Sequence, residues 1–228
     1  MRGRARRLVD AAGPELLGGL AVLFAGAWLF AVVAEEVVEG NTHADTRLAD
    51  WLHDHAQPWL TEIFEAITVL GNFATLLAVV AVAAVLLLRR GERAEAALVV
   101  LAFAGAQVIT FGLKLGFQRE RPFFPDPLAT ETSYSFPSGH SVVSAAVYGA
   151  IGLILARHLS TRRAQLAALA GAALLILLIG FSRLYLGVHY LTDVVAGIAL
   201  GLAWLALCVV ALHLRLRLRQ TSRYRASA

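Results

Sequence analysis

Three short polar clusters, each at the edge of a long apolar run, carry the side chains best suited to chemistry. They read KLGFQRERP over residues 114–122, PSGH over 137–140 and SRLYLGVHYLTD over 182–193. Together they supply cations that can hold a phosphoryl group, two histidines, and a carboxylate that can orient one histidine. The residues singled out on this basis are Lys114, Arg121, Ser138, Gly139, His140, Arg183, His189 and Asp193. This set predicts phosphoryl transfer without a metal ion.

The first cluster is ambiguous when taken alone, because cations often extend from helix ends to the membrane interface. Lys114 and Arg121 are seven residues apart, and Pro122 predicts that the chain leaves its helix near Arg119. Both side chains can then point into one pocket. Arg119 itself is interpreted as an ordinary external cation.

The second cluster has the pattern of a helix start. Ser138 after Pro137 is a typical N-cap, and Gly139 is common beside one. Such a start exposes backbone N–H groups, and these groups and the helix dipole both favour an anion. His140 in the first turn is expected beside that anion.

In the third cluster, His189 and Asp193 are four residues apart and are expected on one helical face. The carboxylate can then accept a hydrogen bond from one ring nitrogen and leave the other nitrogen as a nucleophile. The alternative is a pair with only a structural role, which is costly within a membrane.

The composition indicates an all-α, polytopic membrane protein with a single domain over residues 1–228. The chain is 58% hydrophobic and has a mean hydropathy of +0.68, more apolar than one soluble core requires. Six apolar stretches are each long enough to cross a hydrocarbon core of ~30 Å as a helix. These expected transmembrane helices are 15–38, 61–88, 94–117, 140–157, 163–181 and 190–213.

Residues 41–60 are too polar to cross the membrane, and their pattern predicts a short amphipathic helix on the outer surface. Asn41 is the expected N-cap and Pro58 the expected end, with Trp51 and Trp59 as interfacial anchors. Its aspartates are expected away from the apolar face: Asp45, Asp50 and Asp54.

The basic residues predict the orientation. Fifteen of the 20 Lys and Arg residues fall on one side of the six-span arrangement, which the positive-inside rule makes cytoplasmic. The three clusters then lie at the extracytoplasmic face. Because these arginines flank membrane segments, we expect the lipid bilayer to be their partner and not nucleic acid.

The three clusters match the pattern K-x6-RP, PSGH and SR-x5-H-x3-D, and the chain resembles the type 2 phosphatidic acid phosphatase (PAP2) superfamily. Every motif position in residues 114–193 matches. The resemblance implies a hydrolase in which His189 forms a phosphohistidine, Asp193 orients it and His140 is the acid for the leaving group. It also implies phosphate binding by Lys114, Arg121, Ser138, Gly139 and Arg183.

The resemblance further implies a lipid phosphatase of the bacterial plasma membrane that acts at the outer leaflet without metal or other cofactor. Undecaprenyl diphosphate is the favoured substrate, with phosphatidylglycerophosphate or phosphatidic acid as alternatives. A vanadate-dependent haloperoxidase shares these motifs but is disfavoured by the six spans. A lipid-phosphate binding or transport protein remains the non-enzymatic alternative, although the sequence shows no repeated or discontinuous half-structures.

The remaining motifs are weak. No Walker sequence, metal-ligand cluster or glycine-rich nucleotide loop is visible. His43, His53 and His55 are interpreted as solvated surface residues and not as metal ligands, because His53 and His55 do not share a helical face.

Overall fold

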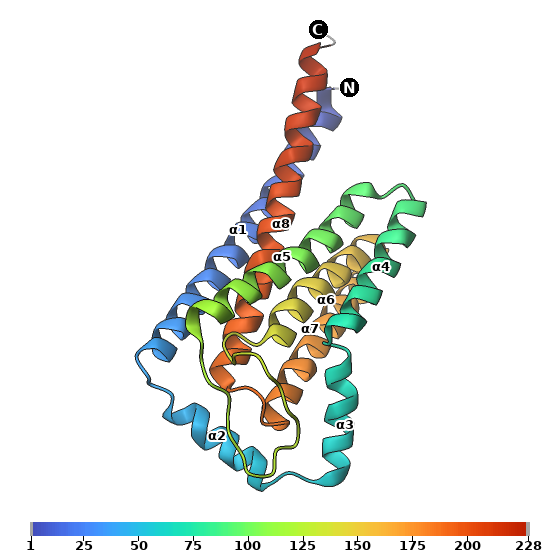
Figure 1. The fold of residues 1–228 in the computed structure, drawn as a ribbon. Coiled ribbons are helices and arrows are strands. Elements are labelled where there is room, and N and C mark those ends of the chain that lie inside the picture. The colour runs from blue at the N-terminus through green and yellow to red at the C-terminus, as the bar shows by residue number, and fades with distance from the viewer. Residues whose placement is uncertain (1, 227–228) are drawn as a thin grey trace.

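Eight helices and no strand make up the part of the chain that this computed structural model describes, which is the backbone of residues 2–226 and the side chains of residues 16–215. Figure 1 shows them in chain order. Their bounds are α1 (Arg2–Val38), α2 (His43–Asp54), α3 (Pro58–Val69), α4 (Phe73–Arg89), α5 (Arg93–Phe117), α6 (Gly139–His158), α7 (Arg162–Tyr185) and α8 (Leu191–Ala226).

The helices confirm an all-α polytopic membrane fold. Five of them contain a segment long and apolar enough to cross a membrane: Leu16–Val38, Arg93–Phe117, Gly139–His158, Arg162–Tyr185 and Leu191–Arg215. The pair α3 and α4, bent by 44° at a short break, is long and apolar enough to form a sixth crossing if the two helices make one span. The prediction of one continuous helix over 61–88 was therefore wrong.

The break between α3 and α4 is held by contacts with α6. A Cβ on Gly71 would lie 2.7 Å from Cδ2 of His140, so the absence of a side chain allows α6 to approach closely. The carbonyl of Leu70 accepts a hydrogen bond of 2.7 Å from the Tyr148 hydroxyl of α6. Contacts with α6 thus satisfy backbone groups that a continuous helix would satisfy internally.

The two ends of the helix bundle differ in character. Both termini and the turn between α4 and α5 lie at one end, whereas α2 and the loop of residues 118–138 lie at the other (Figure 1). Arg89 at the end of α4, Arg90 in the turn and Arg93 at the start of α5 therefore lie at the end opposite to the loop. The side chains of the terminal arginines used in the orientation prediction, residues 2–7 and 217–225, lie outside the described residues.

Helix α6 forms the centre of the bundle and packs against α4, α5, α7 and α8. Ten of its 20 residues are buried, and most of these are small or β-branched. Close packing with α8 depends on glycine: a Cβ on Gly201 would lie 2.3 Å from the carbonyl oxygen of Val142. The start of α6, where PSGH lies, is thereby held against the start of α8.

Helix α2 differs from its predicted form in three respects. It begins after Thr42 and not after Asn41, and it ends at Asp54, while Pro58 opens α3 instead of ending α2. Proline suits the first turn of a helix because it needs no hydrogen-bonded N–H there. Third, Asp45 is buried with Ala49 and Leu52, although it was expected on a polar face.

We expect Gly201→Ala to lower the melting temperature of the detergent-purified protein, because the new methyl group must displace the α6 backbone, at a cost of about 1–3 kcal/mol. Gly171→Ala on α7 is the matched control, since its Cβ would meet no atom within 4 Å. Equal melting temperatures for the two variants would show that α6 and α8 tolerate a wider separation.

Candidate active site

The three polar clusters meet at the loop end of the bundle. They line an inner cavity of about 150 Å³, to which they contribute Lys114, Arg121, Gly139, His140 and His189. The long loop adds Glu131 and Ser133, and the α3–α4 break adds Gly71. Segments distant in the sequence thus place two histidines and two cations around one small space.

His189 and Asp193 are paired, but not on one helix as expected. His189 precedes α8, and Asp193 lies in the first turn of α8, where its Oδ2 accepts a 2.9 Å hydrogen bond from the backbone N–H of Tyr190. This bond caps the helix and turns the chain so that Nδ1 of His189 lies 3.2 Å from the same oxygen. The Ser135 hydroxyl also donates to Oδ2.

The other ring nitrogen of His189 faces a cation. Nη1 of Arg121 lies 3.1 Å from Nε2 of His189 and also donates to the Val188 carbonyl. A guanidinium can only donate, so Nε2 accepts and the ring proton is on Nδ1, toward Asp193. Burial lowers the pKa of His189 to about 3, and the nearby Arg121 and Arg183 act in the same direction against the opposing effect of Asp193. His189 is therefore neutral near pH 7.

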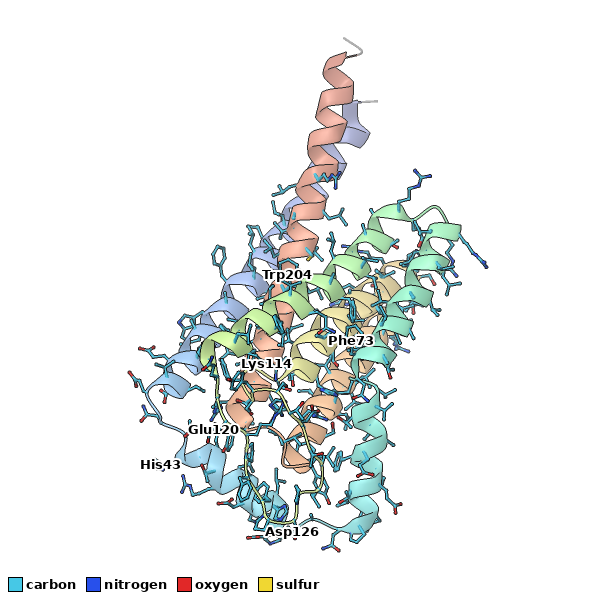
Figure 2. All side chains as sticks on the ribbon, in the orientation of Figure 1. His43, Phe73, Lys114, Glu120, Asp126 and Trp204 are labelled. Atoms are coloured by element: carbon cyan, nitrogen blue, oxygen red, sulfur yellow. The ribbon has the colours of Figure 1, made fainter. Side chains whose placement is uncertain are left out.

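A left-handed residue brings Lys114 and Arg121 to the same cavity. Helix α5 ends at Phe117, and Gln118 has a φ of 48°, which redirects the chain. Lys114, at the loop end of α5 in Figure 2, donates to the Ser133 hydroxyl at 3.2 Å and to the Tyr134 carbonyl. Arg121 bonds to the same two residues, so neutral loop groups hold both cations.

His140 lies in the first turn of α6, and Ser138 is the N-cap, as predicted. Nε2 of His140 is 2.7 Å from Oδ1 of Asn72, the residue preceding α4. With the amide oriented in this way, Nε2 carries a proton and Nδ1 is the nitrogen available for proton transfer. Sequence reasoning missed Asn72, because it lies inside what was expected to be a continuous apolar helix.

Ser138 and Arg183 lie behind the residues that line the inner cavity. The Ser138 hydroxyl is fully buried and accepts from the Ser141 N–H at 3.4 Å. Arg183 donates to Thr68 at 2.7 Å and forms an ion pair with Glu131, which does line the cavity. A carboxylate of the loop thus neutralises one of the expected phosphate-binding cations.

Arg119 is not the ordinary external cation that the sequence suggested. Its side chain is only 11% exposed and forms ion pairs with Asp193 at 2.6 Å and Asp45 at 2.8 Å. The sequence around Arg119 does not reveal these ion pairs, because Asp45 lies on α2, 74 residues earlier in the chain.

A wider cavity of about 590 Å³ adjoins the inner one and shares Lys114 and Arg121 with it. Phe111 and Leu115 of α5 line this outer cavity, and their side chains are 67% and 51% exposed on the lateral surface of the helix. The outer cavity therefore connects the polar site with the apolar flank of the bundle.

The remaining histidines lie away from the cavity. His53 stacks on Phe124 with ring centroids 4.0 Å apart and pairs with Asp126, so it fastens α2 to the loop and is not simply solvated. At the opposite end, Nε2 of His158 lies 3.0 Å from Glu92, and Glu95 is next to them. The hydrogen bond from His158 lowers the pKa of Glu92. No motif in the sequence indicated that these residues lie together.

We predict that ¹⁵N-histidine NMR will show His189 as the Nδ1–H tautomer, with no titration between pH 8 and 5. At a pKa of about 3, only ~1% of the ring is protonated at pH 5. The His189 signals are assigned by their loss in His189→Ala. A midpoint near 6.5 for His189 would contradict the assigned environment.

Comparison with known protein families gives a match over more than half of the chain. The sequence model described as "PAP2 superfamily" matches residues 95–217, which include all three clusters. Phosphatidylglycerophosphatase B of Bacillus subtilis is 38% identical over 149 residues, covering 64% of this chain and 72% of that protein. Decaprenylphosphoryl-5-phosphoribose phosphatase of Mycolicibacterium smegmatis is 38% identical over 112 residues, covering 48% of this chain and 53% of that protein.

Solved structures show the same fold. The transmembrane PAP2-type phosphatidylglycerolphosphate phosphatase from Bacillus subtilis superposes with a TM-score of 0.72 at 32% identity, covering 83% of this chain and 93% of that one. LpxE of Aquifex aeolicus superposes with a TM-score of 0.59 at 23% identity, covering 73% of this chain and 94% of that one, a likeness of fold alone.

Proposed function

Because this chain belongs to the PAP2 superfamily and is a membrane lipid phosphatase of that family, we propose that it hydrolyses a lipid phosphate ester through a phosphohistidine on His189. One observation carries the proposal. The neutral His189 has its Nδ1–H on Asp193, and its Nε2 lone pair lies at the inner cavity beside Arg121.

In the proposed first step, Nε2 of His189 attacks phosphorus and the bond from phosphorus to the lipid oxygen breaks. Asp193 stabilises the positive charge that develops on the imidazole. His140 enters this step as the imidazolium: it gives its Nδ1 proton to the departing oxygen, while its Nε2–H keeps the hydrogen bond to the side-chain oxygen of Asn72. The products of this step are the lipid alcohol and a phosphohistidine.

In the second step, water attacks the phosphohistidine, and His140 takes a proton from that water. Inorganic phosphate leaves, and His189 returns to its neutral form. Lys114, Arg121 and the N–H groups at the start of α6 are placed to stabilise the negative charge on the phosphoryl oxygens in both steps. When substrate binds, Lys114 and Arg121 would exchange their hydrogen bonds to the loop residues Ser133 and Tyr134 for bonds to phosphoryl oxygens.

The donor set supports a mechanism that needs no metal ion. The cavity presents Lys114 and Arg121 where a metal site would present carboxylates. Both oxygens of Asp193 are already engaged by Arg119, Ser135 and Tyr190. Glu131 is paired with Arg183.

We place a glycerolipid phosphate monoester, phosphatidylglycerophosphate, first among the substrates. The names given to the Bacillus subtilis relative and to the solved Bacillus subtilis structure describe activity on that lipid. The inner cavity of about 150 Å³ suits one phosphoryl group, and the outer cavity of about 590 Å³ offers room for the rest of a head group. Undecaprenyl diphosphate is the second candidate, because the cations shared by the two cavities can also hold a second phosphate.

Binding or transport without hydrolysis is the alternative from another class. Transporters often contain discontinuous helices such as the pair α3 and α4, which the apolar pattern of residues 61–88 did not indicate. In this protein the break supplies Asn72 to His140 and Thr68 to Arg183. Binding alone does not require that Asp193 orient His189 or that Asn72 orient His140. Both arrangements are useful for nucleophilic attack and proton transfer.

The decisive measurement is phosphate release by detergent-purified protein from phosphatidylglycerophosphate, phosphatidic acid and undecaprenyl diphosphate, with and without EDTA. We expect the highest kcat/KM for phosphatidylglycerophosphate and no effect of EDTA. His189→Ala should lower kcat by at least about 10³-fold, because the nucleophile is lost. His43→Ala, a change at an exposed histidine, is the control. A well-folded His189→Ala variant with the wild-type rate would overturn the covalent mechanism.

We also propose that the protein resides in the bacterial plasma membrane with the candidate site on the extracytoplasmic side. The arginines at the turn between α4 and α5 and at the end of α6 lie opposite the loop. An outward site fits substrates of the outer leaflet.

Cysteine labelling in intact cells tests this orientation. Phe123→Cys, at a loop position 88% exposed, should react with an impermeant thiol reagent, and Arg162→Cys should not. The native Cys208 is buried and gives little background. Labelling of Arg162→Cys alone would reverse the orientation.

A further inference from the structure

We propose that Arg119 and Asp45 are positioning residues, a relay that fixes Asp193 and, through it, the tautomer and orientation of His189. This makes the external helix α2, which carries Asp45, part of the reaction machinery. The inference rests on the proposed function, in which His189 is the nucleophile.

The guanidinium of Arg119 bridges two buried carboxylates. Nη1 donates to Oδ1 of Asp193 at 2.6 Å, and Nη2 donates to Oδ2 of Asp45 at 2.8 Å. The side chain of Asp193 is 0% exposed and that of Asp45 is 2% exposed. Charge-assisted bonds between groups so well shielded from water are strong and directional.

The same residue also organises the loop around Asp193. The carbonyl of Arg119 accepts a 2.8 Å hydrogen bond from the N–H of Ser135, whose hydroxyl donates to Oδ2 of Asp193. The ring of Tyr190 lies 4.3 Å from the guanidinium carbon and covers its face. Arg119 and Ser135 therefore hold the two oxygens of Asp193 from opposite ends of one closed loop.

Asp45 fixes the other side of Arg119 by docking on α8. Its Oδ1 accepts a 3.0 Å hydrogen bond from the N–H of Thr192, and its Oδ2 accepts from the Thr192 hydroxyl. Thr192 is in the first turn of α8, where the helix dipole favours an anion. Arg119 also donates to the Thr192 hydroxyl at 2.7 Å, which completes the connection between the two carboxylates.

Loss of Arg119 has a defined consequence for His189. Two carboxylates would remain buried without a cation, a state that favours protonation or rotation of Asp193. A rotated Asp193 no longer accepts from Nδ1, and a neutral Asp193 accepts only weakly, so the proton of His189 is free to move to Nε2 and block the nucleophile. The effect on turnover thus passes through Asp193 and needs no contact between Arg119 and the substrate.

Two other roles for Arg119 predict different results. As a phosphate ligand in the outer cavity, which it lines, it would chiefly raise KM when removed. As a purely structural ion pair with Asp193 and Asp45, it would lower the melting temperature when removed and leave kcat and the His189 tautomer of the folded variant unchanged. A positioning residue lowers kcat, and its effect disappears when Asp193 no longer orients His189.

The first test is a double-mutant cycle on phosphate release. We expect Arg119→Ala to lower kcat by roughly 10²-fold with KM changed less than about threefold, and Arg119→Lys to restore part of the loss. In the Asp193→Asn background, Arg119→Ala should lower kcat further by less than about threefold. Asp45→Asn should lower kcat by about 10-fold.

Arg47→Ala and Asp50→Asn, exposed changes on α2, are the charge-matched controls. Additive losses in the cycle, or a rise in KM alone, would overturn the relay.

The second test is independent of turnover. In ¹⁵N-histidine NMR, Arg119→Ala and Asp45→Asn should shift the His189 signals toward the Nε2–H tautomer, whereas Arg47→Ala should leave them in place. If Arg119→Ala does not fold, Arg119→Lys and Asp45→Asn carry the measurement. Unchanged His189 signals in the folded variants refute the relay. Absence of phosphate release by the wild-type protein from every lipid refutes the proposed function instead, while the NMR result still decides the relay.

Discussion

Asp193 is the group on which the arrangement of the candidate site depends. A carboxylate with no exposure to solvent must have donors for both oxygens, and here they come from three parts of the chain. Arg119 and Ser135 come from the two ends of the long loop, and the Tyr190 N–H and the His189 ring come from the turn before α8. The backbone carbonyl of Asp193 accepts from Ser138 at 3.1 Å, which ties the start of α6 to the start of α8. The positions of the loop, both histidines and α2 are therefore coupled to one buried charge.

This coupling explains which parts of the molecule could be predicted from sequence. Long apolar stretches must form helices in a membrane, so the five continuous membrane-spanning helices followed from hydropathy alone. Lys114, Arg121, His140 and His189 were found because each lies in a short motif with its own local geometry. Asp45, Asn72 and Arg119 were missed, because their partners are 68 to 147 residues away in the chain and no local pattern records such contacts.

The break between α3 and α4 escaped prediction for a related reason. Residues 61–88 are apolar enough for a continuous helix, and neither Gly71 nor Asn72 is sufficient to end one. The interruption depends on contacts with α6: the hydroxyl of Tyr148 bonds to Leu70, and the ring of His140 fills the space beside Gly71. Tertiary contacts thus override helix propensity at the position where the bundle needs a polar group for His140.

The lateral position of the outer cavity determines which measure of substrate concentration sets the rate of encounter. Phe111 and Leu115 line that cavity and are exposed on the lateral surface of α5, the kind of surface that a membrane-spanning helix presents to lipid. A lipid that enters there diffuses in two dimensions and never passes through bulk water. The rate of encounter then follows the mole fraction of that lipid in the surrounding membrane or micelle, and not its concentration in the total volume. Added detergent or inert lipid slows encounter by surface dilution, even when the amounts of protein and substrate are unchanged.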